Sequence, residues 1–185
     1  PGESYGIVNP IAKWSGISGP EISIGQGIAI NNLQLAMAYS AVANGGFLLK
    51  PQIIKEIQFS DETGYFYSPE VVRRSISEET SLKLLSMLEN VISKGTGASA
   101  GISGFYIAGK TGTAQKVVDG EYSTNSFNSS FAAIFPVENP QYVCIVSVDS
   151  PDYTRGYHWG SETAAPIVKR IFERLIFQQD KNYQL

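Results

Sequence analysis

The chain has 185 residues, of which 43% are hydrophobic and 17% are charged, a composition ordinary for a folded globular protein with one buried core. Its 14 Lys and Arg residues against 17 Asp and Glu residues give a net charge of −3, and no basic run stands out, which argues against a nucleic-acid partner. With 1 Cys and 1 His, the sequence provides neither an internal disulfide nor a His/Cys zinc site.

The first part of the chain predicts little regular structure. Residues 1–30 are rich in Gly, Pro and Ser, and they predict loops with short extended pieces. The chain opens at Pro1 without a methionine, on the turn-like PGESYG, so we expect it to be part of a longer protein. No run of ~18 apolar residues and no signal peptide occur in it, so no membrane span is expected within the chain.

A helix and a hairpin come next. Residues 31–46, NNLQLAMAYSAVANGG, predict a helix with Asn31 or Asn32 as its N-cap and Gly45 at a left-handed stop. Residues 52–76 predict a hairpin, because QIIKEIQF and YFYSPEVVRRSI flank the polar turn SDETG.

A second helix is predicted over residues 77–93. Ser77 is its expected N-cap, and Glu78 and Glu79 lie where the helix dipole favours negative charge. Its apolar stripe consists of Leu84, Leu85, Leu88, Val91 and Ile92. Residues 94–104, KGTGASAGISG, predict a flexible connection.

The last third of the chain predicts mostly strand. The expected strands are FYIAGKTGTAQKVV, SSFAAIF and QYVCIVSV, and the last of these contains Cys144 as a small core residue. A tight turn at Asn139 and Pro140 predicts an antiparallel pair. A C-terminal helix is expected over residues 162–177, with an apolar face that includes Ile167, Ile171 and Leu175. Grouped strands followed by a helix predict an α+β fold with an antiparallel sheet flanked by helices.

The stretch GFYIAGKTGTAQK, residues 104–116, has two incompatible interpretations. Its first eight letters satisfy the phosphate-loop pattern G-x-x-x-x-G-K-[ST], in which a Gly-rich turn enters a helix. Bulky strand-forming residues fill the interior of this match, and TGTAQKVV after Lys110 is a poor helix start. We therefore predict that the segment is a strand and that the phosphate-loop match is coincidental.

On a strand, Lys110 and Gly112 point to one face, and Thr111 and Thr113 point to the other. Gly109 and Gly112 would leave room for the backbone of a ligand along the strand edge. An extended peptide can pair with such an edge while hydroxyls and an ammonium bind its carboxylate, and a backbone N–H near Thr113 can serve in an oxyanion hole. The alternative is a glycine-kinked strand that carries a surface lysine.

The surrounding motifs decide between these alternatives. In chain order they are GQG, ANGG, LLKPQIIKEI, GTG, AGKTGTAQ, SFAAIFP and AAPIV. Together they resemble the class B penicillin-binding proteins, the peptidoglycan D,D-transpeptidases of bacterial cell division and elongation. The resemblance extends from the first residue to about residue 176.

Members of this family carry the motifs SxxK, SxN and KTG in that order, and this chain has only the third. STN at Ser123 and SFN at Ser126 fit SxN by letter, but they follow KTGT and are expected in a loop, so we interpret them as chance. The resemblance thus implies that residues 1–185 are the C-terminal part of one β-lactamase/transpeptidase-like domain, with the nucleophilic serine and its lysine upstream of Pro1 or on a separate polypeptide. The chain alone is expected to be inactive.

The resemblance also implies roles for matched residues. Lys110 resembles the motif lysine, which supplies positive potential and contacts the serine of the second motif. Thr111 and Thr113 resemble the hydroxyls that bind the terminal carboxylate of D-Ala-D-Ala or of a β-lactam, and the Thr113 N–H resembles the second oxyanion donor. Gly109 and Gly112 resemble positions of close backbone approach.

Two further segments match the family less closely. YTRGYHWGSETAAP resembles the aromatic segment before AAPV, which places His158 and Trp159 beside the cleft; Ser161 departs from the family's second glycine. The alternative for His158 is an ordinary surface-loop residue, and in neither case is it a catalytic base. GQG, Gly25 to Gly27, serves either packing or the lining of the cleft.

The resemblance implies a serine acyl-transfer enzyme at the extracytoplasmic face of the bacterial membrane. Its expected partners are the stem peptide ending in D-Ala-D-Ala, β-lactams, the upstream part of the domain and other cell-wall synthesis proteins. No metal or organic cofactor is implied. Alternatives are a β-lactam sensor or β-lactamase, a phosphate-loop nucleotide-binding domain, and a non-catalytic interaction module that has kept the fold.

Overall fold

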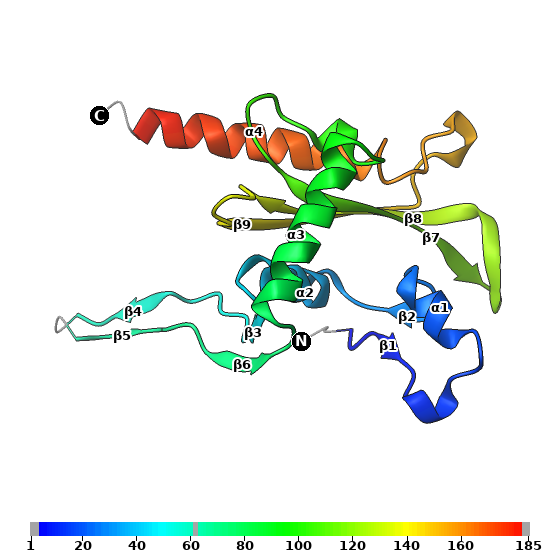
Figure 1. The fold of residues 1–185 in the computed structure, drawn as a ribbon, viewed down its shortest axis with the longest axis horizontal. Coiled ribbons are helices and arrows are strands. Elements are labelled where there is room, and N and C mark those ends of the chain that lie inside the picture. The colour runs from blue at the N-terminus through cyan, green and yellow to red at the C-terminus, as the bar shows by residue number, and fades with distance from the viewer. Residues whose placement is uncertain (1–3, 61–62, 183–185) are drawn as a thin grey trace.

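The computed structural model describes residues 4–60 and 63–182. Its centre is an antiparallel sheet in the order β7-β8-β9, made of β7 (Ala108–Val118), β8 (Glu121–Phe135) and β9 (Tyr142–Asp149). Helix α4 (Ala164–Asn182) lies on one side of this sheet and α2 (Asn32–Ala43) on the other (Figure 1). The predicted α+β class, with an antiparallel sheet flanked by helices, is confirmed.

Helix α3 (Glu78–Ser93) links the two layers. Its Leu85 packs with Ala108 and Ile134 in the apolar cluster that adjoins α2. Its Ile92 joins a second cluster with Phe131 and Phe172, which holds α4 against the sheet. Burial of these side chains on both faces holds the sheet between α2 and α4.

The two internal helices begin at the predicted caps. The Asn31 side chain accepts a hydrogen bond from the Gln34 N–H, and the Gln34 side chain accepts one from the Asn31 N–H, which completes a capping box before α2. Gly45 follows α2 with φ +82°, as the left-handed stop requires. Ser77 caps α3 by accepting from the Thr80 N–H.

The N-terminal region contains a short helix that the sequence did not indicate. The extended pieces are confirmed, since β1 (Ile7–Val8) pairs with β2 (Ile28–Ala29). Between them lie a 3-10 turn (Ile11–Lys13) and α1 (Ser18–Ser23). Pro20 is compatible with the first turn of a helix, where the N–H that proline lacks has no intrahelical partner.

The predicted hairpin is confirmed only in part. β4 (Glu56–Gln58) and β5 (Gly64–Phe66) form an antiparallel pair, and residues 61–62 of the turn lie outside the described residues. The second half of the predicted strand is separate, because β6 (Val71–Arg74) pairs with β3 (Phe47–Leu49). Pro69, which lacks an N–H to donate, lies between β5 and β6.

β8 is longer than predicted. The turn before it is Asp119–Gly120, with φ values of 53° and 87°, the two positive values of a type I′ hairpin. Ser123 and Ser126 therefore lie in β8, and the prediction that they occupy a loop was wrong. β8 and β9 are antiparallel on either side of Asn139 and Pro140, as predicted.

The predicted apolar face of helix α4 is confirmed only in part. Val168 and Phe172 are fully buried, whereas Ile167 and Ile171 are 41% and 39% exposed. Leu175, the third predicted residue, packs against the cluster of Phe131 and Phe172, so the prediction is confirmed for Leu175. It was wrong for the two isoleucines, because α4 carries two adjacent apolar stripes. Ala164 and Ala165, both buried, bring the first turn close to the sheet and select the Val168 and Phe172 stripe.

Two smaller predictions are refined. Residues 94–104 contain a 3-10 turn (Ala98–Ala100) whose Ala100 is buried in the α4-side cluster, so this connection is packed and not a free linker. Cys144 is half-buried on β9 against the same cluster, and burial raises the pKa of its thiol. Among the helices of residues 4–60 and 63–182, none has the length and apolar character needed to span a bilayer.

Candidate functional site

The KTGT segment lies on an open strand edge. β7 continues without interruption from Ala108 to Val118, and in the described part of the chain it pairs with β8 alone. The residues directly after Lys110 continue β7 as far as Val118 and do not begin a helix, so the segment has no phosphate-loop geometry. The alternative of a phosphate-loop nucleotide site is therefore rejected.

Lys110 is exposed and carries a charge available to a ligand. Its Nζ donates to the Thr111 carbonyl oxygen at 2.9 Å and lies 3.4 Å from Thr111 Oγ1. Among the described residues, the four recorded ion pairs do not include Lys110. Its ammonium is thus held at the strand edge by neutral acceptors and attracts anions.

Thr111 and Thr113 share one face of β7. Their cross-strand partners on β8 are Phe131 and Ser129, which are both buried on the α4 side. Thr111 Oγ1 also lies 3.3 Å from the Oγ1 of Thr96, which precedes the 3-10 turn. Two hydroxyls therefore line the same side of the strand, as the alternation predicts.

The Thr113 hydroxyl is bound to the loop between β9 and α4, residues 150–163. The Gly160 N–H donates to Thr113 Oγ1 at 3.1 Å, and the Gly160 carbonyl oxygen accepts from the Ala165 N–H at 2.9 Å. Two serines also bind this β9–α4 loop: Ser129 Oγ donates to the carbonyl of His158 and Ser99 Oγ to that of Ser161. The loop is thereby fixed against β7 and β8.

Different contacts leave no room for a side chain at the glycines in and beside the KTGT segment. A Cβ at Gly109 would lie 2.7 Å from Phe131 Cε1 and 2.8 Å from the Ala132 oxygen, so packing inside the protein already accounts for this glycine. A Cβ at Gly112 would collide with Ser130 Oγ. Gly160 lies directly over the β7–β8 ladder, where a Cβ would collide with the Ser130 carbonyl oxygen and lie 2.6 Å from the Gly112 oxygen.

His158 and Trp159 lie in an aromatic cluster beside this strand. The His158 ring centroid is 4.8 Å from that of Phe127, 5.1 Å from that of Tyr153 and 4.7 Å from that of Trp159. His158 Nδ1 is buried and has no hydrogen-bond partner among the described residues, whereas Trp159 is 53% exposed. The cluster forms a wall next to the Thr113 hydroxyl, because Trp159 directly precedes Gly160.

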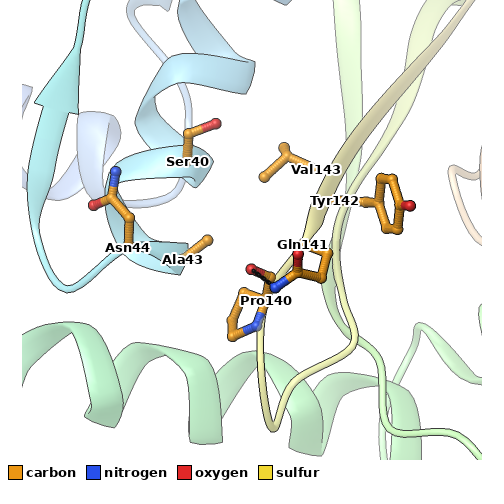
Figure 2. A pocket seen from close by; sticks show the side chains of 7 residues that line it. All are labelled: Ser40, Ala43, Asn44, Pro140, Gln141, Tyr142 and Val143. Carbon is orange, nitrogen blue, oxygen red and sulfur yellow. Dashed lines mark hydrogen bonds between the residues drawn. The ribbon is translucent and has the colours of Figure 1, made fainter. Parts of the chain in front are cut away.

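Two hollows in the described part of the chain lie away from the KTGT segment. An open hollow of about 230 Å³ lies between the end of α2 and the turn that joins β8 to β9, as Figure 2 shows. None of its lining residues carries a charge: they are Ser40, Ala43, Asn44, Pro140, Gln141, Tyr142 and Val143. A larger groove of about 580 Å³, with a mostly apolar lining, runs along α2, β3 and β6. Neither is lined by the KTGT segment, which lies along the open edge of β7.

Comparison with known proteins identifies the family. Residues 1–173 match the family model described as the penicillin binding protein transpeptidase domain. The chain belongs to this family. The sequence resemblance is therefore confirmed, and the KTGT strand of this transpeptidase domain is the segment at the open edge of β7.

Individual relatives agree with this membership. Stage V sporulation protein D of Bacillus subtilis is 39% identical over 172 residues, which cover 92% of this chain and 26% of that protein. A peptidoglycan D,D-transpeptidase FtsI homolog of Mesostigma viride is 37% identical, covering 95% of this chain and 32% of that protein. The crystal structure of penicillin-binding protein 3 from Mycobacterium tuberculosis, complexed with aztreonam, has a TM-score of 0.84 and 33% identity, covering 97% of this chain and 42% of that one. This transpeptidase-domain chain thus spans about a third of the length of the two named relatives, or less.

The transpeptidase-domain site also includes residues that sequence reasoning missed. Gly160 of the β9–α4 loop binds Thr113, and Ser129 of β8 binds the same loop at His158. Thr96 contacts Thr111. The GTG motif around Thr96 was visible in the sequence, but its contact with β7 was not. Gly25 and Gly27 of GQG have φ values of +85° and +70°, so left-handed backbone geometry accounts for both.

Proposed function

We propose that this chain supplies the strand that grips the donor peptide in a peptidoglycan D,D-transpeptidase. The observation that carries the proposal is the open edge of β7, where the Lys110 ammonium and the hydroxyls of Thr111 and Thr113 lie together. A cation and hydroxyl donors along an extended backbone suit a peptide that ends in a carboxylate. Membership of the penicillin binding protein transpeptidase domain family supports it.

We further propose that residues 1–185 are the C-terminal part of one such domain. These residues contain no SxxK motif, and their two SxN letter matches follow KTGT on β8, so the SxxK and SxN motifs of the site are assigned to the preceding part of the same domain. The serine hydroxyl attacks the carbonyl carbon between the two D-Ala residues, an ester forms, and the terminal D-Ala leaves as a free amine. An amine of a neighbouring stem then attacks the ester, which forms the cross-link and restores the serine.

In this reaction Lys110 attracts the donor carboxylate, and the hydroxyls of Thr111 and Thr113 donate to it. The Thr113 N–H is the second oxyanion donor. Lys110 Nζ binds the Thr111 carbonyl oxygen, which indicates that this carbonyl points to the open edge of β7. Backbone groups of residues two apart in a strand point to the same edge, so this geometry favours a Thr113 N–H at the open edge as well. His158 and Trp159 wall the cleft, and Gly112 keeps the strand free of a side chain.

The proposal places the reaction at the extracytoplasmic face of a bacterial membrane, with β-lactams as inhibitors and other cell-wall synthesis proteins as partners. This location is the one at which peptidoglycan strands are available for cross-linking.

The test uses the complete protein that carries this chain together with its SxxK segment. A fluorescent penicillin should label the serine in a stable 1:1 adduct, and a D-Ala-D-Ala peptide with an amine acceptor should give a cross-linked product by mass spectrometry. Absence of labelling contradicts the proposal. Rapid hydrolysis of the penicillin without cross-linking indicates a β-lactamase, and stable labelling without cross-linking indicates a sensor.

A further inference from the structure

One backbone group of the β9–α4 loop is bound to a side chain of the KTGT strand. The Gly160 N–H donates to Thr113 Oγ1 at 3.1 Å, in a partly buried position. The Gly160 carbonyl oxygen is in turn bound by the Ala165 N–H in the first turns of α4. Gly160 therefore connects a helix that is anchored in the core to one hydroxyl of the candidate site.

This contact restricts the directions in which the hydroxyl proton can point. A threonine hydroxyl has one proton to donate and two lone pairs to accept with. Because the Gly160 N–H occupies a lone pair, the proton must point away from Gly160. Donation by the N–H also polarises the O–H bond, which makes the hydroxyl a better donor to an anion.

We propose that Gly160 is a positioning residue for carboxylate recognition, which holds the Thr113 hydroxyl so that its proton is presented to the carboxylate of the bound peptide or β-lactam. This inference rests on the proposed function and deepens it. Thr113 is the residue that touches the ligand, and Gly160 acts through it.

The local packing explains why this position must be glycine. Gly160 is buried against the β7–β8 ladder, and a Cβ there would collide with the Ser130 carbonyl oxygen and lie 2.6 Å from the Gly112 oxygen. Both obstacles are backbone atoms, which cannot rotate away. An alanine at 160 must lift the loop from the strand and lengthen the bond from its N–H to Thr113 Oγ1.

The test compares acylation of the complete protein by benzylpenicillin and by its methyl ester, which lacks the carboxylate charge. Thr113→Val should slow acylation by the acid about ten- to a hundredfold, the range for one hydrogen bond to a charged group, and leave the ester within about twofold. Thr113→Ser should restore the acid rate. Gly160→Ala should slow acylation by the acid about tenfold and leave acylation by the ester unchanged. In the double variant with Thr113→Val, it should cause no further loss of rate.

Two controls keep the outcome interpretable. Gly19→Ala makes the same change where a new Cβ meets nothing within 4 Å, and it should leave both rates unchanged. Ser129→Ala removes the hydroxyl that binds the His158 carbonyl and keeps the Thr113 side chain unchanged, and it should lower the acid-to-ester ratio about threefold even where Gly160→Ala does not fold.

The positioning role is overturned if Gly160→Ala slows acylation by the acid and by the ester equally. It is also overturned if the rate losses of Gly160→Ala and Thr113→Val multiply in the double variant. An unchanged ratio in Ser129→Ala overturns it as well. If the unmodified protein is acylated by neither compound, the proposed function fails, which is a different result.

Discussion

Lys110 Nζ lies 3.4 Å from Thr111 Oγ1, although the two side chains leave opposite faces of β7. They meet because β7 has an open edge, around which the long lysine side chain bends to reach the Thr111 carbonyl oxygen. A positive charge and a hydroxyl are thus combined at one point of the strand, where an extended ligand would end.

Removing the charge of Lys110 should weaken recognition of anionic ligands. Lys110→Gln retains most of the length and loses the ammonium, so the acylation rate of the complete protein by benzylpenicillin should fall about ten- to a hundredfold, the range for a hydrogen bond to a charged group. Stopped-flow or competition labelling measures it. Lys116→Gln on the same strand is the matched control, because Lys116 already binds Asp149, and a similar fall in both variants would contradict the assignment.

The isolated chain should fold but not react. Residues 1–185 contain the KTGT strand and no SxxK motif, so a fluorescent penicillin should leave no covalent label on the chain after denaturation. Circular dichroism confirms folding in the same sample, and the complete protein is the positive control. A covalent adduct on the isolated chain, located by mass spectrometry, would show that its nucleophile lies within these residues.

The buried face of α4 can be tested by two neighbouring substitutions. Phe172 is fully buried and stacks on Phe135 with ring centroids 5.0 Å apart, so Phe172→Ala should lower the free energy of unfolding by about 3–5 kcal/mol. Ile171 is 39% exposed, so Ile171→Ala should cost under about 1 kcal/mol. Urea denaturation of both variants measures the difference, and equal losses would show that the helix is rotated.

Lys116 should control the acidity of Asp149. The hydrogen bond from Lys116 Nζ, at 2.7 Å, is the main cause that lowers the pKa of Asp149 below its ordinary value of 3.8. Because the folded pKa is the lower one, the pair stabilises the fold above pH 3.8 and loses this contribution as the pH falls through the folded pKa. The carboxylate is exposed, so the contribution is weak and screened by salt. In Lys116→Gln, an NMR titration of the Asp149 carboxyl should give a higher pKa, and an unchanged value would refute the link.

Local signals were sufficient for much of the fold. The caps at Asn31 and Ser77 and the strand character around Lys110 depend on neighbouring residues, and the structure confirms them. The hairpin turn at Asp119–Gly120 was equally local, and reading it would have corrected the start of β8.

Other features depend on contacts between distant residues. β6 pairs with β3 and not with the adjacent hairpin, which no local pattern specifies. The two apolar stripes of α4 are equivalent by periodicity, and packing of the helix against the sheet, with Ala164 and Ala165 buried there, selects one. In the candidate site, the strand period predicts which of the four KTGT side chains share a face. The hydrogen bond from the Gly160 N–H to Thr113 Oγ1 joins residues far apart in the sequence, so no local pattern predicts it.

The contact of Gly160 with the β7–β8 ladder also restricts how this protein can evolve. Backbone oxygens fill the space that even a methyl group would need, so selection by an antibiotic cannot easily act by substitution at this position. Under the proposed function, variation that alters β-lactam binding should instead arise at exposed residues beside the strand, such as Trp159, where a new side chain extends into solvent. A survey of resistant isolates should therefore find the glycine retained while its neighbours differ.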